Sequence, residues 1–508
     1  MTKKNIKVLL LYPPEQSWPE MMCKPNGSLA YPMLAGALLE AGIEVEIYDA
    51  CVGNEKDDLD EVFYKSTQLP SGMLRTGVSP ERILDKVSNF DLVGITSIFS
   101  HQETMVLETC KLIKNRFPDK LMVTGGVNAR HRKDIFFKAG FDIICTSEAE
   151  KTIVEIARCL ENKSYNFENI PFISYLKNGK IINSKKHGEI FWNLDDLPMP
   201  AWEMLPNDRY WKIRRPHGGH FEESEDLRYA SMMTSLGCPF SCSFCHIAGE
   251  TKSSESGPIG KFRIKSDERV LAELDRLKGM GVKQIFIEDD SIFGKKNRAV
   301  RLLNKVTDYG FDILDVNGVN IVHLLKSGEP DHELLETLKS AGFIDIGLPF
   351  ESGNPRIISK YASNKWNIER TNIPALLKAC KDHDLRISGN FMIGYPDETR
   401  AEIQNTIDLA EKCIDQGLDS ASFFLVMPLP GTPLFDTAMK QGYLEKDYNP
   451  DKMHWQKANM INTIVSPKEL EEIRDHAWET INKSNFTKYK KSMRVISDPH
   501  TGEIHEIK

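Results

Sequence analysis

Short apolar runs alternate with amphipathic segments along the first 160 residues. The apolar runs have the length and β-branched content of buried strands, and they are residues 6–14, 44–50, 91–100 and 120–126. The segments between them have helical spacing, as in residues 32–42, which end in a glycine typical of a helix C-terminus. Strands that alternate with helices predict a parallel sheet with right-handed crossovers, so we expect an α/β domain over residues 1–160.

The pattern changes between residues 161 and 205, which we interpret as a connector. Asn178 and Gly179 separate two strand-like runs, and this dipeptide is a strong signal for a β-hairpin. Residues 193–205 are interrupted by prolines and are typical of a linker.

Alternation resumes after this connector. Six strand-like runs start near residues 229, 284, 312, 343, 385 and 420. Six β/α units predict a partial (β/α)6 barrel of the TIM type over residues 206–440, although periodicity alone does not separate a barrel from a second open sheet. We expect residues 441–508 to form a small helical region.

Composition and charge limit the partners of the chain. It has 508 residues, 41% of them hydrophobic, and a formal net charge of -8, so it lacks the basic surface that binds phosphates. The apolar run near the N-terminus is too short for a signal peptide, and no stretch is long enough to span a bilayer. We expect a cytoplasmic protein with no nucleic-acid partner and no transmembrane segment.

Three cysteines lie close together, at Cys238, Cys242 and Cys245. They follow the first strand of the second series, at the carboxyl end where barrel enzymes build their sites. A cubane iron–sulfur cluster uses three cysteines and leaves one iron open. Zinc prefers four protein ligands, and His246 is an awkward fourth because it adjoins Cys245. We favour an iron–sulfur cluster, with zinc or no metal as the alternatives.

The CxxxCxxC spacing, with Phe244 before the last cysteine, resembles the signature of radical S-adenosylmethionine (SAM) enzymes. The segments FIEDDSI, FESGNP, FMIGYPDET and PLPGTPL are also similar to that family, over about residues 228–435. The resemblance implies a 4Fe-4S cluster on the three cysteines, with SAM on the open iron. It implies SAM contacts from Phe244, Glu288, Asp289, Asp290, Glu351, Ser352, Asn390 and Met392. The alternatives are a helix cap for Asp289 and Asp290 and a solvated carboxylate for Glu351.

The first 160 residues resemble the cobalamin-binding domain that precedes the barrel in one subfamily of radical SAM enzymes. The segments LLYPP, YPMLAGALLEAG, GITS, TGGVNA and SEAE occur in the order of that subfamily. The resemblance implies a Rossmann-like, doubly wound cobalamin-binding domain over residues 1–160. It also implies cobalamin near Tyr12, Ser97, Gly125, Gly126, Ser147 and Glu148. Two features depart from the pattern: no DxHxxG segment supplies a histidine ligand to cobalt, and Ser147 stands where a glycine is common. A domain that does not bind cobalamin is the alternative.

The resemblance implies methylation of an unactivated carbon, or of phosphorus, through a 5′-deoxyadenosyl radical and methylcobalamin. It also implies a small-molecule or lipid-like substrate and an electron donor such as flavodoxin or ferredoxin. The alternative within the family is a cyclase or rearrangement enzyme without methyl transfer. The alternative from another class is a zinc-stabilised binding protein without catalytic activity.

Overall fold

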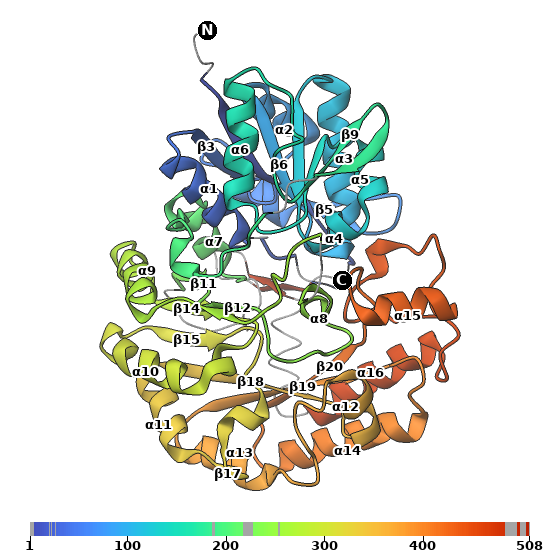
Figure 1. Ribbon diagram of the computed structural model, residues 1–508. Coiled ribbons are helices and arrows are strands. Elements are labelled where there is room, and N and C mark those ends of the chain that lie inside the picture. Colours follow the sequence, from blue (N-terminus) through green and yellow to red (C-terminus); the bar gives the residue numbers. More distant parts are fainter. Residues whose placement is uncertain are drawn as a thin grey trace. The chain divides into compact units, whose positions relative to one another are not determined.

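The chain folds into two compact units, as the computed structural model of the protein shows (Figure 1). The structure describes residues 5–19, 21, 23–25, 27–184, 188–216, 227–251, 255–482, 495–497 and 504–506. The first unit comprises Met1–Leu227, Lys252–Ile259 and Ser492–Lys508, and the second comprises Arg228–Thr251 and Gly260–Lys491. After the cysteine motif the chain therefore passes through a short piece of the first unit before it returns to the second.

A seven-stranded sheet forms the centre of the first unit, in the order β10-β9-β8-β7-β6-β1-β3. Its parallel strands are β1 (Lys7–Tyr12), β3 (Glu44–Asp49), β6 (Leu92–Thr96), β7 (Leu121–Gly125) and β8 (Ile143–Cys145). The chain moves outward from β1 to β3 and then returns to the other side of β1 at β6. The strand order thus reverses between β1 and β6, and doubly wound sheets bind ligands at the carboxyl ends beside such a reversal.

Helices cover both faces of this sheet (Figure 1). They are α1 (Ala30–Glu40) and α6 (Glu150–Glu161) on one face, and α2 (Pro80–Ser88), α3 (Glu103–Arg116) and α5 (Lys133–Ala139) on the other. Val8 and Leu10 of β1 pack in the first layer, whereas Leu9 and Leu11 pack in the second. A strand buried on both faces is a continuous apolar run, which is why the pattern predicted it. The doubly wound prediction is confirmed.

The predicted hairpin is present and belongs to the sheet of the first unit. Strands β9 (Ile173–Lys177) and β10 (Lys180–Asn183) are antiparallel. Asn178 and Gly179 between them have φ of 53° and 73°, as a tight hairpin turn requires. Because β9 also pairs with β8, the hairpin extends the sheet rather than standing outside it as a connector.

Six parallel strands in sequence order form the second unit. They are β11 (Tyr229–Met232), β14 (Gln284–Ile287), β15 (Asp312–Asp315), β18 (Phe343–Glu351), β19 (Arg386–Ile393) and β20 (Ser420–Leu425). Within the described residues β11 and β20 do not pair with each other, so the barrel is open. The predicted partial (β/α)6 barrel is confirmed.

Each barrel strand leads into a loop and then a helix, so all the carboxyl ends meet at one mouth of the barrel. The helices are α9 (Asp267–Gly279), α10 (Lys296–Val306), α11 (His332–Ala341), α12 (Pro355–Tyr361), α13 (Ile373–Asp382), α14 (Arg400–Asp415) and α15 (Pro433–Gln441). A short ribbon of β12 (Ser235–Leu236) and β13 (Arg263–Ile264) frames the cysteine loop. Side chains fix the helix starts: Thr399 and Glu402 form a reciprocal capping box at α14.

The C-terminal region is helical only in part. It contains α16 (Pro467–Ile481), which Asn482 docks on β20 by exchanging two 2.9 Å hydrogen bonds with the backbone of Ala421. Strands β21 (Val495–Ser497) and β22 (Ile504–Glu506) then form an antiparallel pair, which the sequence pattern did not predict because each strand is so short. Residues 483–494 of the predicted helical region lie outside the described residues.

Candidate functional site

The cysteine loop begins at a glycine that the backbone requires. Gly237 has φ of 78°, and a Cβ added there would lie 2.3 Å from the carbonyl oxygen of Lys261. The backbone N–H of Gly237 donates to Asp290 Oδ2 at 2.8 Å, and that of Cys238 donates to the Gly260 carbonyl at 3.2 Å. These contacts turn the chain sharply at the carboxyl end of the first barrel strand.

The three thiols suit a metal cluster. Cys242 is buried, and Cys238 and Cys245 are partly buried. Burial raises the pKa of Cys242 and of Cys245 to about 12, so their thiolates need a strongly cationic partner. Among the described residues, no three His, Cys, Asp or Glu side chains converge on a single-ion site. A cubane does not need such convergence because each cysteine binds a different iron. The donor set therefore fits a 4Fe-4S cluster.

Three consecutive carboxylates follow β14, and they have different surroundings. Asp289 is buried and accepts hydrogen bonds from Thr234 N at 2.6 Å and from Ser235 Oγ at 2.6 Å, which ties β14 to the end of β11. Asp290 holds the turn of the cysteine loop, so both aspartates serve the loop rather than a helix N-terminus. Glu288 differs, because its Oε1 is buried without a hydrogen-bond partner among the described residues, and burial raises the pKa of Glu288. Glu288 is thus the carboxylate with an oxygen free for a ligand.

Glu351 and Ser352 end the strand β18. Glu351 is only 6% exposed, not solvated, and it receives a hydrogen bond from the buried ammonium of Lys365. Its φ of 62° is left-handed, a conformation that a non-glycine residue keeps only where its surroundings impose it. Ser352 Oγ lies 3.1 Å from Thr406 Oγ1 and accepts from Asn354 N at 3.1 Å. Sequence reasoning missed Lys365, since no motif marks a lone lysine in a loop.

An apolar wall adjoins the cysteine loop. The Phe244 ring centroid lies 6.2 Å from that of Tyr395, and Tyr395 stacks on Tyr361 at 4.4 Å. Tyr395 Oη donates to the Met392 sulfur at 3.8 Å. The third predicted residue on this side, Asn390, lies on β19 opposite Pro349 of β18. Phe244 and Met392 are brought together around Tyr395, and Asn390 lies two residues before Met392 on the same strand.

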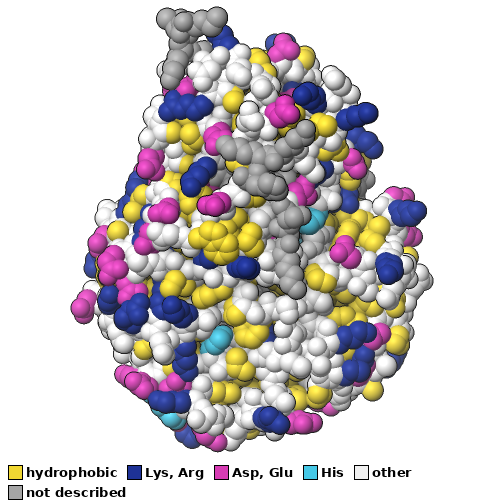
Figure 2. All heavy atoms as spheres, viewed as in Figure 1, with side chains coloured by type: hydrophobic (Ala, Val, Ile, Leu, Met, Phe, Trp, Pro, Cys, Tyr) yellow, Lys and Arg dark blue, Asp and Glu magenta, His cyan; other side chains and the backbone are white. Residues whose placement is uncertain are grey.

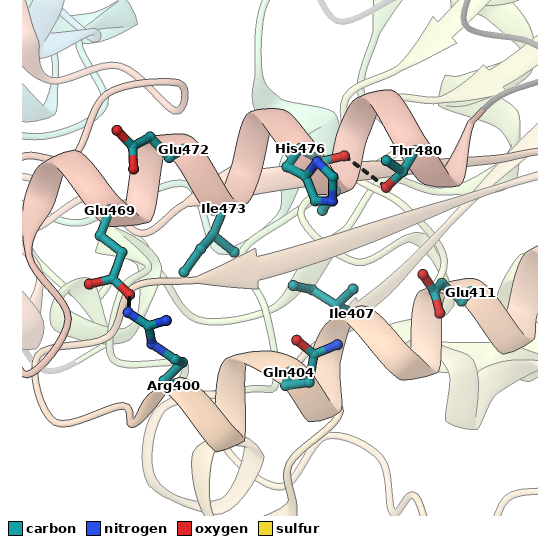
Figure 3. Close-up of a pocket in the computed structure, with 10 residues that line it drawn as sticks. Arg400, Gln404, Ile407, Glu411, Glu469, Glu472, Ile473, His476 and Thr480 are labelled. Carbon is teal, nitrogen blue, oxygen red and sulfur yellow. Dashed lines mark hydrogen bonds and ion pairs between the residues drawn. The ribbon is translucent and has the colours of Figure 1, made fainter.

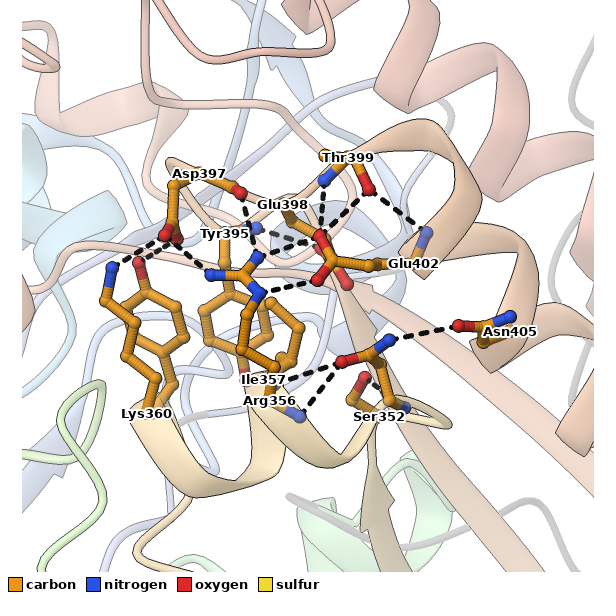
Figure 4. Close-up of polar contacts among 12 residues, drawn as sticks. Ser352, Arg356, Ile357, Lys360, Tyr395, Asp397, Glu398, Thr399, Glu402 and Asn405 are labelled. Carbon is orange, nitrogen blue, oxygen red and sulfur yellow. Dashed lines mark hydrogen bonds and ion pairs between the residues drawn. The ribbon is translucent and has the colours of Figure 1, made fainter.

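A polar network ties the segment after β18 to the segment after β19 (Figure 4). Arg356 donates to Asp397 Oδ2 at 2.7 Å and to Glu402 Oε2 at 2.8 Å. Lys360 also donates to Asp397 Oδ2, at 2.6 Å. These side chains are partly exposed, and exposed ion pairs add little to the free energy of unfolding. We therefore infer that the network mainly aligns the two segments.

The six residues predicted to contact cobalamin come from the carboxyl ends of neighbouring strands. Tyr12 ends β1, but it is buried: its ring lies 4.1 Å from that of Tyr31 and its hydroxyl donates to the Ser28 carbonyl. Ser97 follows β6 and accepts from Asn128 Nδ2 at 3.1 Å.

Gly125 and Gly126 let the loops after β6 and β7 approach each other. The Gly125 carbonyl accepts from Ser97 N at 2.8 Å. Gly126 has φ of 99°, and a Cβ there would lie 2.4 Å from the Ser97 carbonyl oxygen. Packing of the protein alone therefore requires Gly126, whatever ligand lies above it.

The chain that returns from the cysteine motif covers the end of β8. Ser147 Oγ donates to the Ser256 carbonyl at 2.6 Å, and Thr146 Oγ1 donates to that of Glu255 at 3.3 Å. Glu148 accepts from Phe191 N at 2.9 Å. Ser147, which departs from the subfamily glycine, thus has a structural use: its hydroxyl holds residues 255–259 to the first unit.

A separate cavity of 640 Å³ lies between α14 and α16, lined by residues that include Arg400, His476 and Thr480 (Figure 3). None of the predicted site residues lines it. On the face drawn in Figure 2, Lys and Arg side chains are interspersed with Asp and Glu. No helix among the described residues is long and apolar enough to cross a membrane.

Residues 232–410 match the model of the radical SAM superfamily. The match starts at the end of β11 and contains the three cysteines and the carboxylates after β14 and β18. The second unit of this chain thus contains a radical SAM domain. The prediction of a radical SAM enzyme is confirmed.

Curated relatives align with most of this chain. An uncharacterised methyltransferase of Pyrococcus horikoshii is 28% identical over 382 residues, 74% of this chain and 74% of its own. Cytidylyl-2-hydroxyethylphosphonate methyltransferase of Streptomyces wedmorensis is 26% identical over 498 residues, 91% of this chain and 86% of its own. Anaerobic magnesium-protoporphyrin IX monomethyl ester cyclase of Cereibacter sphaeroides is 23% identical over 400 residues, 77% of this chain and 59% of its own.

Solved structures share the fold of both units. The radical SAM methyltransferase TsrM from Kitasatospora setae, described with cobalamin and a [4Fe-4S] cluster bound, has a TM-score of 0.60 at 16% identity and covers 86% of this chain and 75% of its own. OxsB, described as a cobalamin-dependent SAM radical enzyme, has a TM-score of 0.60 at 16% identity and covers 99% of this chain and 64% of its own. The resemblance to radical SAM enzymes with a cobalamin-binding domain is thus confirmed at the level of the fold.

Proposed function

We propose that this protein is a cobalamin-dependent radical SAM methyltransferase that acts on an unactivated carbon or on phosphorus. One observation carries the proposal: a single chain joins a radical SAM barrel to a doubly wound domain with a strand reversal between β1 and β6. Support comes from the two relatives named as methyltransferases and from the fold shared with two enzymes described with cobalamin.

The residues around the cysteine loop take the following roles. Cys238, Cys242 and Cys245 bind the cluster and leave one iron for SAM. Glu288 offers its unpartnered oxygen to the amino group of SAM, and Glu351 accepts from the ribose hydroxyls. When bound, the cluster and SAM supply a 5′-deoxyadenosyl radical, and methylcobalamin supplies a methyl group.

The remaining site residues shape the cavity. Phe244 and Met392, with the stacked Tyr361 and Tyr395, form an apolar wall that excludes water from the site. Asp289 and Asp290 keep the cysteine loop in place through the hydrogen bonds described above. The enzyme holds its reactants in one orientation, which removes an entropic barrier to their meeting.

The first unit holds cobalamin at the carboxyl edge of its sheet in this proposal. Tyr12 and Ser97 are engaged in protein contacts, so they support the edge, while the backbone at Gly125 and Gly126 approaches the ligand. No histidine occurs among the six predicted contacts, so cobalt receives no protein nitrogen. We further propose a small-molecule or lipid-like substrate, a flavodoxin-like or ferredoxin-like electron donor, and a cytoplasmic location.

The stoichiometry of SAM consumption tests the methyl transfer. Each turnover should consume two SAM molecules: one becomes 5′-deoxyadenosine, and the other re-methylates cobalamin and becomes S-adenosylhomocysteine. With the true substrate, the two products should form in equal amounts, and label from the SAM methyl group should appear in the product.

Matched cysteine variants control this experiment. Cys242→Ala should abolish formation of 5′-deoxyadenosine, whereas Cys380→Ala, a buried cysteine of α13, should retain it. If 5′-deoxyadenosine forms with product while S-adenosylhomocysteine stays at background, methylation is wrong and a cyclase or rearrangement takes its place. Activity retained in Cys242→Ala would remove the cluster assignment itself.

A further inference from the structure

Lys365 is a buried cation beside the cysteine loop. Its side chain is 9% exposed, and its ammonium donates to Glu351 Oε1. An ammonium has three N–H donors, and the described residues supply no second acceptor for it. Burying a cation with unused donors is costly, so the position calls for another anionic or acceptor group.

The protein holds Lys365 rigidly. Ser363 and Asn364, the two residues before it, both have left-handed backbone, with φ of 57° and 49°. Trp366, the residue after it, is buried and donates from Nε1 to the Phe350 carbonyl at 2.8 Å. A loop that accepts two strained residues and an anchored tryptophan fixes where the lysine points.

The same loop is fastened to the cysteine loop. Ser363 Oγ accepts from Ser241 N at 3.2 Å, and the Tyr361 carbonyl accepts from Ser243 N at 2.8 Å. These two contacts fall between Cys238 and Cys245, so the segment that carries Lys365 and the segment that carries the thiols keep one geometry.

The charge of Lys365 acts on the thiols of both Cys238 and Cys242, so the ammonium lies within electrostatic range of the cysteine loop. The opposing charges are Asp290 at Cys238 and Glu351 at Cys242.

We propose that Lys365 is a positioning residue that raises the reduction potential of the cluster, an inference that rests on the proposed function. Three thiolates around an oxidised cubane core leave a net negative charge, and the added electron makes it more negative. A fixed cation nearby stabilises the reduced form more than the oxidised form, and hydrogen bonds to cluster sulfurs act in the same direction. Lys365 thereby makes the cluster easier for the electron donor to reduce.

A redox titration tests the effect of Lys365 on the reduction potential. It uses the full-length, anaerobically reconstituted protein without SAM and is followed by electron paramagnetic resonance. At the potential where half of the wild-type cluster is reduced, Lys365→Met should lower the ratio of reduced to oxidised cluster at least about tenfold. Lys365→Arg should stay close to wild type. Lys360→Met, which removes an exposed lysine from the end of α12, should not change the ratio.

Glu351→Gln provides the decisive test, because it should change the ratio of reduced to oxidised cluster in the opposite direction. It leaves the cation without its counter-charge, so the ratio should rise, opposite to Lys365→Met. General damage to the site would move both variants in one direction, which would overturn the inference, as would an unchanged ratio in Lys365→Met. If Lys365→Met does not load iron, the test rests on Glu351→Gln. A ratio of reduced to oxidised cluster that does not rise in Glu351→Gln then overturns the inference. A wild-type protein that binds no cluster would overturn the proposed function as well.

Discussion

At the scale of single residues, the cysteine loop depends on Gly237. Gly237→Ala places a Cβ 2.3 Å from the Lys261 carbonyl oxygen, on backbone with φ of 78°. Left-handed backbone alone costs a residue with a Cβ about 1–2 kcal/mol. We expect iron loading after anaerobic reconstitution, measured as iron per chain, to fall roughly tenfold, equivalent to about 1.4 kcal/mol.

Gly279→Ala is the matched control. Gly279 ends α9, and no atom of the described residues lies within 4 Å of a Cβ added there. This variant should load iron like the wild type and unfold at a slightly higher temperature, since alanine favours a helix over glycine by up to about 1 kcal/mol. Equal iron loading in the two variants would mean that the turn at Gly237 does not shape the cluster site.

The residues of the site differ in how far the sequence could reveal them. The cysteines could be found because their chemistry is local, within one loop. The different surroundings of Glu288, Asp289 and Asp290 could not, because Asp289 is bonded to Thr234 and Asp290 to Gly237, which are both distant in sequence. Lys365 could not be found either, since its contact with Glu351 requires two left-handed residues that no propensity predicts.

At the scale of elements, the turn from β19 to α14 depends on Glu398. Its Oε2 accepts from Gly394 N at 2.7 Å and from Tyr395 N at 3.2 Å, while Oε1 is buried and has no partner in the part of the chain that the structure describes. Burial raises the pKa of Glu398 from 4.5 to about 8, the Glu402 charge adds to this, and Arg356 opposes it. The folded chain therefore prefers the protonated carboxyl.

The sign of the pH effect follows from this preference. Stability that comes from protonated Glu398 is complete below pH 4.5 and is lost as the pH rises through about 8. Between pH 5 and pH 8, we expect the free energy of unfolding, measured in denaturant, to fall more in the wild type than in Glu398→Gln. The difference should be a few kcal/mol, at about 1.4 kcal/mol per pKa unit. Parallel curves for the two proteins would show that this carboxyl does not carry the dependence.

The elements themselves were predictable where a pattern ran long enough. The parallel strands are buried on both faces and therefore read as apolar runs, and Asn178-Gly179 revealed its hairpin. The strands β2 (Glu15–Ser17), β4 (Thr67–Gln68) and β5 (Leu74–Thr76), which form a small antiparallel sheet, gave no comparable signal. Two or three residues are too few for periodicity, so only tertiary pairing defines them.

At the scale of the whole molecule, the proposal assigns cobalamin to a sheet edge without a histidine ligand. We expect the full-length protein, reconstituted anaerobically with cobalamin, to show a cob(II)alamin spectrum by electron paramagnetic resonance without nitrogen superhyperfine splitting. The reason is that none of the six predicted contacts can donate an imidazole nitrogen. Observed nitrogen splitting would contradict this, and the absence of bound cobalamin would support a domain that has lost its ligand.

The short return of the chain through the first unit restricts how such proteins can be recombined. A chimera joined at one junction after Leu227 would inherit the Lys252–Ile259 piece from the barrel parent. That piece would then pack against another protein's first unit, without the Thr146 and Ser147 hydroxyls that hold Glu255 and Ser256 in this chain. A graft that keeps these two hydrogen bonds has to transplant both stretches together, so a single junction does not exchange the two units cleanly.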